Sequence, residues 1–216
     1  MINNSYYWKK ELYLCYTNII KNRFIEGRGV DEHPLYQIEK SLLFGAYIIR
    51  KLNESNKIPV ALLSNRVDIE TSKSIVDTID VLNIHKIDEL YDWGNSIKET
   101  RNWEFVINQI IHSYAIAYSS DERELFNGIY VNSDYTKNFS IYFIPISLIF
   151  ELFLSVSELE INTFDGERKV IGKNEMGKPI YDEYNLINIS HDYPFGFEIN
   201  EIIKNNMCGK YYYRKV

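Results

Sequence analysis

Residues 101–114, RNWEFVINQIIHSY, decide how this chain is interpreted, because they combine a helical pattern with polar side chains suited to chemistry. Drawn as an α-helix, the segment places Arg101, Glu104, Asn108 and His112 on one face, since these residues are three or four positions apart. Apolar residues occupy the other sides. No other segment offers comparable chemistry, so this helix indicates a candidate site without defining an activity.

The composition predicts a folded protein of one large domain, or of a main domain with a smaller appendage. The chain has 216 residues, of which 45% are hydrophobic and 25% are charged, which is enough for a packed core. A net charge of −6 argues against a general nucleic-acid-coating role, although a local basic patch acting on RNA stays open. The 15% of aromatic residues is typical of interfaces and fits a coding bias equally well.

The cysteines, the termini and the apolar runs favour a cytoplasmic protein without cofactor, metal or membrane span. Cys15 and Cys208 form no CxxC pair and have no metal-ligand spacing. The N-terminus lacks an apolar signal core. The most apolar run, from Ile141 to Leu154, contains charge and proline and is shorter than the roughly 18–20 residues of a membrane span. Phosphate loops and the GxSxG elbow are absent, which argues against nucleotide hydrolysis and the common hydrolases.

The order of patterned segments predicts a helical first half and a mixed second half. Apolar spacing predicts helices over 5–26, 34–54, about 96–118 and 146–159, with Gly45 marking a close contact with another helix. Residues 57–84 fit either a helix over 67–82 or a short strand over 79–84. A hairpin is expected around Asp134 to Lys137, a hairpin or ordered excursion over 160–184, and an edge strand at the C-terminal end.

His112, Asn108 and Arg101 are the candidate catalytic residues. Metal-independent RNA cleavage needs a base, a cation that stabilises the phosphorane, and an acid. Histidine serves as base or acid near neutral pH, and arginine is the preferred partner of phosphate. Eleven residues separate Arg101 from His112, roughly 16 Å on an ideal helix, so one straight helix cannot bring both to one phosphate. Two such helices, packed antiparallel about a two-fold axis, would bring Arg101 of one chain nearer to His112 of the other, which predicts a homodimer.

The segment around His112 resembles the motif of the HEPN superfamily, which often reads RNxxxHSY. Asn108 matches the polar position, His112 matches the histidine, and Ser113-Tyr114 match the continuation, whereas Ile107 occupies the position of the arginine. The resemblance implies a small helical bundle. For active members it implies a metal-independent ribonuclease at a dimer interface, in toxin–antitoxin or phage-defence systems.

These observations predict a mainly α fold. Residues 1–118 are expected to form a HEPN-like helical bundle, and residues 119–216 a mixed α/β extension, with a hairpin and a helix, packed on it as one unit. Two functional hypotheses follow. The first is an RNA-targeting ribonuclease, or a degenerate relative, from a bacterial or phage conflict system. The second is a non-catalytic interaction module, such as an antitoxin, an inhibitor or a complex subunit, that binds a protein partner.

Alternative interpretations accompany each candidate. His112 fits a buried histidine bonded to Asn108 or to a loop carbonyl, and Arg101 fits a solvated ion pair with Glu104 or an upstream acid. His85 with Asp88 has the spacing of a metal-binding pair but no second pair beside it, so a surface polar pair is favoured. His191-Asp192 is expected in a loop, where an accidental dyad is common.

Overall fold

The computed structural model describes residues 2–23 and 32–207. Its centre is a five-stranded antiparallel sheet in the order β2-β1-β5-β4-β3. The strands are β1 (Arg66–Lys73), β2 (Ile97–Asn102), β3 (Ser113–Ser120), β4 (Phe126–Ser133) and β5 (Ser140–Pro145). β1 pairs with β5, so the sheet joins the two halves of the chain. The boundary that was expected between residues 1–118 and 119–216 falls inside β3.

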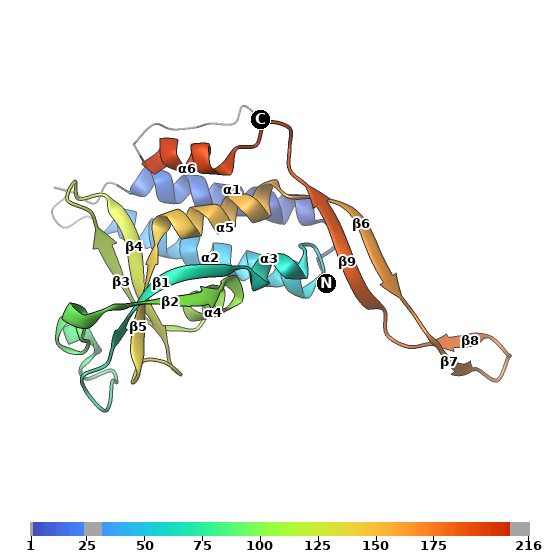
Figure 1. Cartoon of the computed structure of the whole chain (residues 1–216), viewed down its shortest axis with the longest axis horizontal. Helices are drawn as coiled ribbons and strands as arrows, with labels where there is room; N and C mark the ends of the chain where they lie inside the picture. Colours follow the sequence, from blue (N-terminus) through green and yellow to red (C-terminus); the bar gives the residue numbers. More distant parts are fainter. Residues whose placement is uncertain (1, 24–31, 208–216) are drawn as a thin grey trace.

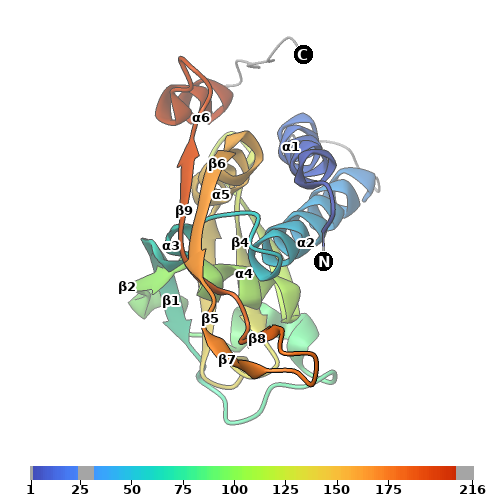
Figure 2. The same ribbon diagram turned by 90° about the vertical axis from the view of Figure 1, so that its right-hand side faces the viewer.

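Helices cover one face of this sheet (Figures 1 and 2). The long helices are α1 (Ser5–Asn22), α2 (His33–Glu54) and α5 (Ile146–Glu158), and the shorter ones are α3 (Val60–Ser64), α4 (Trp103–Ile111) and α6 (Ile199–Met207). The main core lies between helices and sheet, where Leu12, Leu42 and Phe150 are fully buried together with Ile129 and Ile144 of the strands. Burying this apolar face is what fixes the helices on the sheet.

The opposite face of the sheet is partly covered by the segment between β1 and β2. This segment contains two short 3₁₀ helices, Ile84–Glu89 and Trp93–Asn95. Ile79, Leu90 and Tyr91 form a small second core there with Ile141 of β5. Because side chains alternate along a strand, Ile141 faces this segment while its neighbour Tyr142 faces the main core.

A two-stranded ribbon extends away from the body (Figure 1). It consists of β6 (Glu160–Glu167) paired with β9 (Asn185–Asp192), followed outward by β7 (Val170–Lys173) paired with β8 (Pro179–Tyr181). We call residues 160–192 the arm. Neither pair joins the central sheet.

The expected mainly α, HEPN-like bundle is wrong, because the chain folds as helices packed on an antiparallel sheet. The helix expected over 96–118 is three elements, β2, α4 and β3. The side chain of Asn102 caps α4 by accepting a hydrogen bond from the Phe105 amide at 2.9 Å, and the helix ends at Ile111. Residues 113–120 then pair with β4, so long-range strand pairing overrides the local helical pattern.

The predicted helices over 34–54 and 146–159 are confirmed as α2 and α5, and α1 fills the described part of 5–26. The expected hairpin is confirmed as β4–β5, and the excursion over 160–184 as part of the arm. Gly45 does mark a helix contact, since a Cβ there would lie 2.3 Å from Cζ of Phe153 on α5. The strand expected at the C-terminal end falls on 208–216, outside the described residues, as does the predicted end of the first helix.

A depression beside α4 as the candidate functional site

One depression brings the three predicted site residues together. Arg101 lies on β2, Asn108 on α4 and His112 directly after α4, and all three line a cavity of about 710 Å³. The rest of the wall comes from α4, the β4–β5 turn and β5. The residues therefore meet because the fold brings these elements together, and not because they share the face of one helix.

The turn between β4 and β5 is fixed to α4 by a buried glutamine. The Gln109 side-chain oxygen accepts hydrogen bonds from the Ser133 amide and from the Thr136 hydroxyl, both at 2.9 Å. Gln109 is only 5% exposed, so these bonds form away from water. They set the position of Tyr135, whose side chain stands at the rim of the depression.

His112 is exposed, and its partner is an arginine from another helix. Nη1 of Arg50, on α2, lies 3.0 Å from Nε2 of the imidazole. Because a guanidinium only donates hydrogen bonds, Nε2 accepts, and the neutral ring carries its proton on Nδ1. The interpretation of His112 as a buried histidine, bonded to Asn108 or to a loop carbonyl, is therefore wrong, because the residue is exposed. Sequence analysis missed Arg50, which lies 62 positions from His112 in the chain.

Arg101, which lines the depression, and the nearby Arg50 and Lys137 each have a carboxylate partner. Arg101 Nη2 lies 2.5 Å from Oε1 of Glu99, and its guanidinium covers the ring of Phe105 at 4.6 Å. Arg50 Nε lies 3.0 Å from Oε1 of Glu54. In the turn, Lys137 Nζ lies 2.6 Å from Oδ1 of Asp134. These pairs offset part of the positive charge that a phosphate group would need, although Glu54 is shared with Lys51, whose Nζ lies 2.6 Å from Oε2.

Aromatic side chains make up much of the wall and rim. Tyr135 is 87% exposed and Phe139 is 68% exposed. Tyr142 forms a buried part of the wall and packs edge to face against Phe105, with ring centroids 5.0 Å apart. Burial raises the pKa of the Tyr142 phenol, because the charged phenolate is disfavoured away from water. The depression thus combines accessible aromatic surface with paired charges.

Ile107 cannot contribute to this depression. Its side chain is 2% exposed and belongs to the main core. An arginine at the position where the HEPN motif has one would point into the apolar interior between α4 and the neighbouring elements. In this fold the side chain at position 107, where the motif has its arginine, lies in the main core, whereas His112 lines the depression.

The weaker candidates form no common site. Among residues 2–23 and 32–207, no group of three histidine, cysteine, aspartate or glutamate side chains is placed to hold a metal ion. The Asp192 carboxylate accepts a hydrogen bond from Asn162 at 2.7 Å, and the His191 ring packs on Tyr193. Cys15 is buried, and burial raises the pKa of its thiol to about 11. No helix in the described part of the chain is both long and apolar enough to span a membrane.

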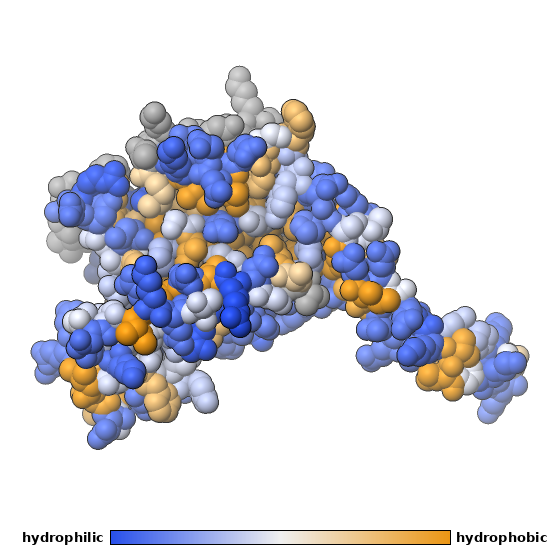
Figure 3. Space-filling model, viewed as in Figure 1, coloured by the Kyte–Doolittle hydropathy of each residue, from blue (hydrophilic) through white to orange (hydrophobic). Residues whose placement is uncertain are grey.

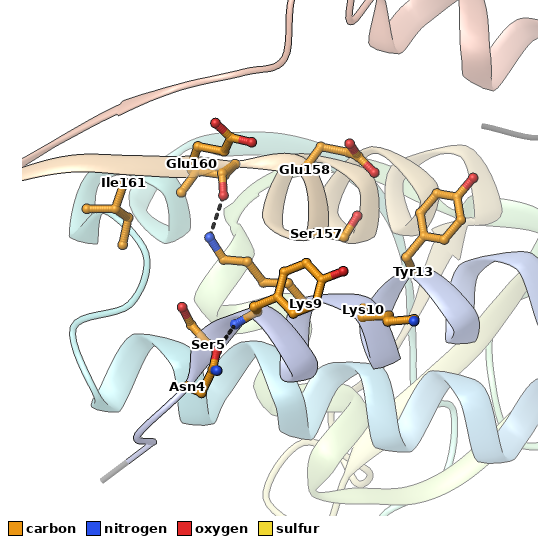
Figure 4. A pocket seen from close by; sticks show the side chains of 11 residues that line it. Asn4, Ser5, Lys9, Lys10, Tyr13, Ser157, Glu158, Glu160 and Ile161 are labelled. Atoms are coloured by element: carbon orange, nitrogen blue, oxygen red, sulfur yellow. Dashed lines mark hydrogen bonds between the residues drawn. The ribbon is translucent and has the colours of Figure 1, made fainter. Parts of the chain in front are cut away.

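A second cavity of about 710 Å³ lies at the root of the arm, between the start of α1 and the end of α5 (Figure 4). Lys9 Nζ donates a hydrogen bond to the backbone oxygen of Leu159, where α5 ends and β6 begins. Burial lowers the pKa of this lysine to about 8, although the charge of Glu160 opposes the effect. Lys9 therefore ties α1 to Leu159, the residue directly before the arm.

Comparisons with family models, with curated proteins and with solved structures found no match to this chain. The functional argument therefore depends on the two cavities, the arm and the charges described above.

Proposed function

We propose that the protein is a non-catalytic interaction module that binds a protein partner at the depression beside α4. The observation that carries this proposal is that Tyr135 and Phe139 are exposed beside cations already paired with carboxylates. A phosphorane is stabilised by preorganised positive charge directed at it. Tyrosine, phenylalanine and arginine are instead enriched at the centres of protein interfaces.

The rigidity of the rim supports the same function. Gln109 holds the turn that carries Tyr135 in one conformation through two buried hydrogen bonds. A contact residue presented by a fixed turn loses less conformational entropy on binding, which favours affinity. The net charge of −6 suits a basic partner. An antitoxin, inhibitor or complex subunit of a conflict system, acting in the cytoplasm, is the setting that we propose.

A capture experiment tests the proposal. The full chain is immobilised and exposed to a lysate of the cells that encode it, beside a Tyr135→Ser/Phe139→Ser variant and a His112→Ala variant. We expect one stoichiometric partner on the wild type and on His112→Ala, and its loss from the double variant. Tyr193, 37% exposed on another part of the surface, supplies the matched control Tyr193→Ser. Equal capture by all four proteins would contradict the proposal.

A second candidate function is metal-independent RNA cleavage, and the Arg50–His112 contact favours it. This contact places Nη1 of the Arg50 guanidinium 3.0 Å from Nε2 of the imidazole. Arg50 thus supplies a cation near His112, whereas position 107, where the motif has an arginine, is an isoleucine. The resemblance of residues 107–114 to the HEPN motif stays a prediction. Purified protein incubated with total RNA, with His112→Ala as control, decides the point. Identical RNA profiles would remove the nuclease, whereas cleavage by the wild type alone would establish it.

A further inference from the structure

Strand β3 is the last strand at one end of the central sheet. Among residues 2–23 and 32–207 it pairs with β4 alone, so one row of its backbone N–H and C=O groups is directed away from the sheet. Figure 1 shows β3 at the left of the body, whereas the arm extends to the right. A strand edge of this kind is a template for pairing with a further strand.

The sequence of β3, SYAIAYSS, lacks the residues that protect a strand edge. Its eight residues include no charged residue and no proline. The strand at the other end of the sheet, β2, has the sequence IKETRN, in which Lys98, Glu99 and Arg101 are charged. Charged side chains and proline on an edge strand oppose pairing with another chain. The sheet is therefore protected at β2 and unprotected at β3.

The strands of the arm also have free edges, but they differ from β3. Charged residues lie within the longer ones, at Asp165 and Glu167 in β6 and at Asp192 in β9. β7 and β8 are only four and three residues long. The surface of the arm is mostly hydrophilic, and its apolar groups are separated from one another (Figure 3). In the described part of the chain, β3 is thus the one long strand that has a free edge and no charge.

The regular part of β3 has a defined centre. The register against β4 shifts before Ala115 and again after Ser119, so residues 115–119 are the uninterrupted part of the strand. The middle residue of this stretch is Ala117. A two-fold axis at that position pairs the stretch antiparallel with its own copy over its full length. Any other register would pair fewer of these residues.

The side chains toward the helices complement themselves in this register. Ile116 of one copy lies opposite Tyr118 of the other, and the two-fold axis makes this contact twice. A pair of an aromatic and a β-branched side chain is a favourable cross-strand neighbour. Both side chains pack against the main core. The Tyr118 hydroxyl donates a hydrogen bond to the Glu39 carboxylate at 3.0 Å, which holds the ring in place.

The side chains on the other face are small and uncharged. Ala117 lies opposite Tyr130 of β4, which packs against the second core, and Ala115 and Ser119 alternate onto the same face. In the paired strands Ala117 meets its own copy and Ala115 meets Ser119. A partner chosen by charge has nothing to recognise on β3. A copy of the same strand, in contrast, matches it in length and in side chains.

We infer that the β3 edges of two copies of this chain pair antiparallel about Ala117 and join the two central sheets into one. The symmetry is closed, so the assembly stops at a dimer. This contact is separate from the depression beside α4, whose exposed Tyr135 belongs to the turn between β4 and β5. It also differs from a dimer built on Arg101 and His112. The inference goes beyond partner binding at the depression and does not depend on it.

Cysteine cross-linking tests the register. In a Cys208→Ser background, Ala117→Cys places two thiols opposite each other, with Cα atoms about 4.5–5.5 Å apart, which is within reach of a disulfide. Ala115→Cys is the matched control, because it changes the same residue type on the same face, while its copy lies roughly 14 Å away. We expect a disulfide-linked dimer from Ala117→Cys and at least about tenfold less from Ala115→Cys under mild oxidation. Equal cross-linking at both positions, or none at either, would overturn the inference.

Sedimentation equilibrium measures the association itself. The wild type is expected to be a dimer. Ala117→Lys and Ala117→Glu each place like charges directly opposite each other, so each alone is expected to associate at least about tenfold more weakly. An equimolar mixture of the two is expected to associate again, because the facing charges are then opposite. The mixture keeps the test decisive if a single variant folds poorly, since a misfolded chain does not regain association.

Ile97→Lys is the control for a new charge on the opposite edge of the sheet. Ile97 is 54% exposed on β2, and this variant is expected to associate as the wild type does. A monomeric wild type, or unchanged association of both Ala117 variants, would overturn the inference. So would loss of association in Ile97→Lys alone, which would move the contact to β2. A monomeric wild type whose β3 amides are protected from hydrogen exchange only when a captured partner is bound would assign the edge to a strand of that partner.

Discussion

Replacement of Lys9 by methionine gives the most quantitative prediction. The lysine is 9% exposed, and its ammonium group donates to the Leu159 carbonyl at the root of the arm. Burial lowers its pKa to about 8 from the ordinary 10.5. The unfolded chain therefore binds more protons than the folded chain between about pH 8 and 10.5, so this group makes the free energy of unfolding rise over that window.

The magnitude follows from the same two values. The interval between about 8 and 10.5 corresponds to about 3 kcal/mol. The cavity gives the ammonium group access to solvent, so we expect about 1–2 kcal/mol after screening. Methionine does not titrate, and its chain fills similar space. As the pH rises from about 7 to about 10, the free energy of unfolding of the wild type should therefore increase by this amount relative to that of Lys9→Met.

Urea unfolding followed by tryptophan fluorescence measures this difference at a series of pH values. Other titrating groups, including Cys15 and the buried tyrosines, are present in both proteins and cancel in the comparison. Lys10→Met is the control, because Lys10 is exposed on the same helix. Parallel stability curves for wild type and Lys9→Met over this range would refute the reasoning, since the lysine would then titrate alike in the folded and unfolded chains.

Three further predictions concern the packing and the site. Gly45→Ala should lower the free energy of unfolding by about 1–3 kcal/mol despite alanine's helix preference, because the new methyl group meets the Phe153 ring; Gly172→Ala, with open space around it, should not change calorimetric stability. Gln109→Leu should cost about 1–3 kcal/mol in urea unfolding, because two buried hydrogen bonds to the Gln109 oxygen are lost and the Ser133 amide keeps only the Thr136 hydroxyl oxygen, at 3.0 Å. Burial raises the pKa of Tyr91 to about 12, so the stability that its protonated form contributes is complete below about pH 10 and is lost as the pH rises through 12. Tyr91→Phe should therefore lose less stability at alkaline pH than the wild type does. An unchanged alkaline unfolding transition would contradict this prediction.

The helices were predictable because apolar residues recur along them at helical spacing. Gly45 was informative for the same reason, since a glycine inside a well-patterned helix indicates a neighbour that approaches closely. The excursion expected over 160–184 was predictable in part, since Gly177 lies in the turn between β7 and β8 with a φ of 72°, whereas Gly166 lies inside β6 at a register shift. Each of these features depends on residues that lie near one another in the chain.

The sheet was not predictable in this way. Residues 66–73 do alternate, with Val67, Ile69 and Thr71 buried, but the two alternatives expected for 57–84, a helix over 67–82 or a strand over 79–84, both differ from this strand. β2 and β3 flank α4 directly, so a helical pattern extended across both. Their identity as strands depends on pairing with β1 and β4, which the local sequence does not reveal.

The sequence predicted some residues of the candidate site but not their partners. Arg101, Asn108 and His112 do line one depression, although the reason given for grouping them, a shared helix face, is wrong. The partners that determine its chemistry, Arg50 and Gln109, have no motif, and Glu99 pairs with Arg101 from the same strand. Such partners become recognisable only when the fold brings their elements together.

Hydrogen–deuterium exchange of the captured complex tests the central claim most directly. We compare amide exchange of the free chain with that of the chain bound to its partner. Binding at the depression should slow exchange over residues 133–139 and at the end of α4, while the arm keeps the exchange rates that it has in the free chain under the same conditions. Unchanged exchange at 133–139, with protection at a different surface, would contradict the assignment of the depression as the site of partner binding.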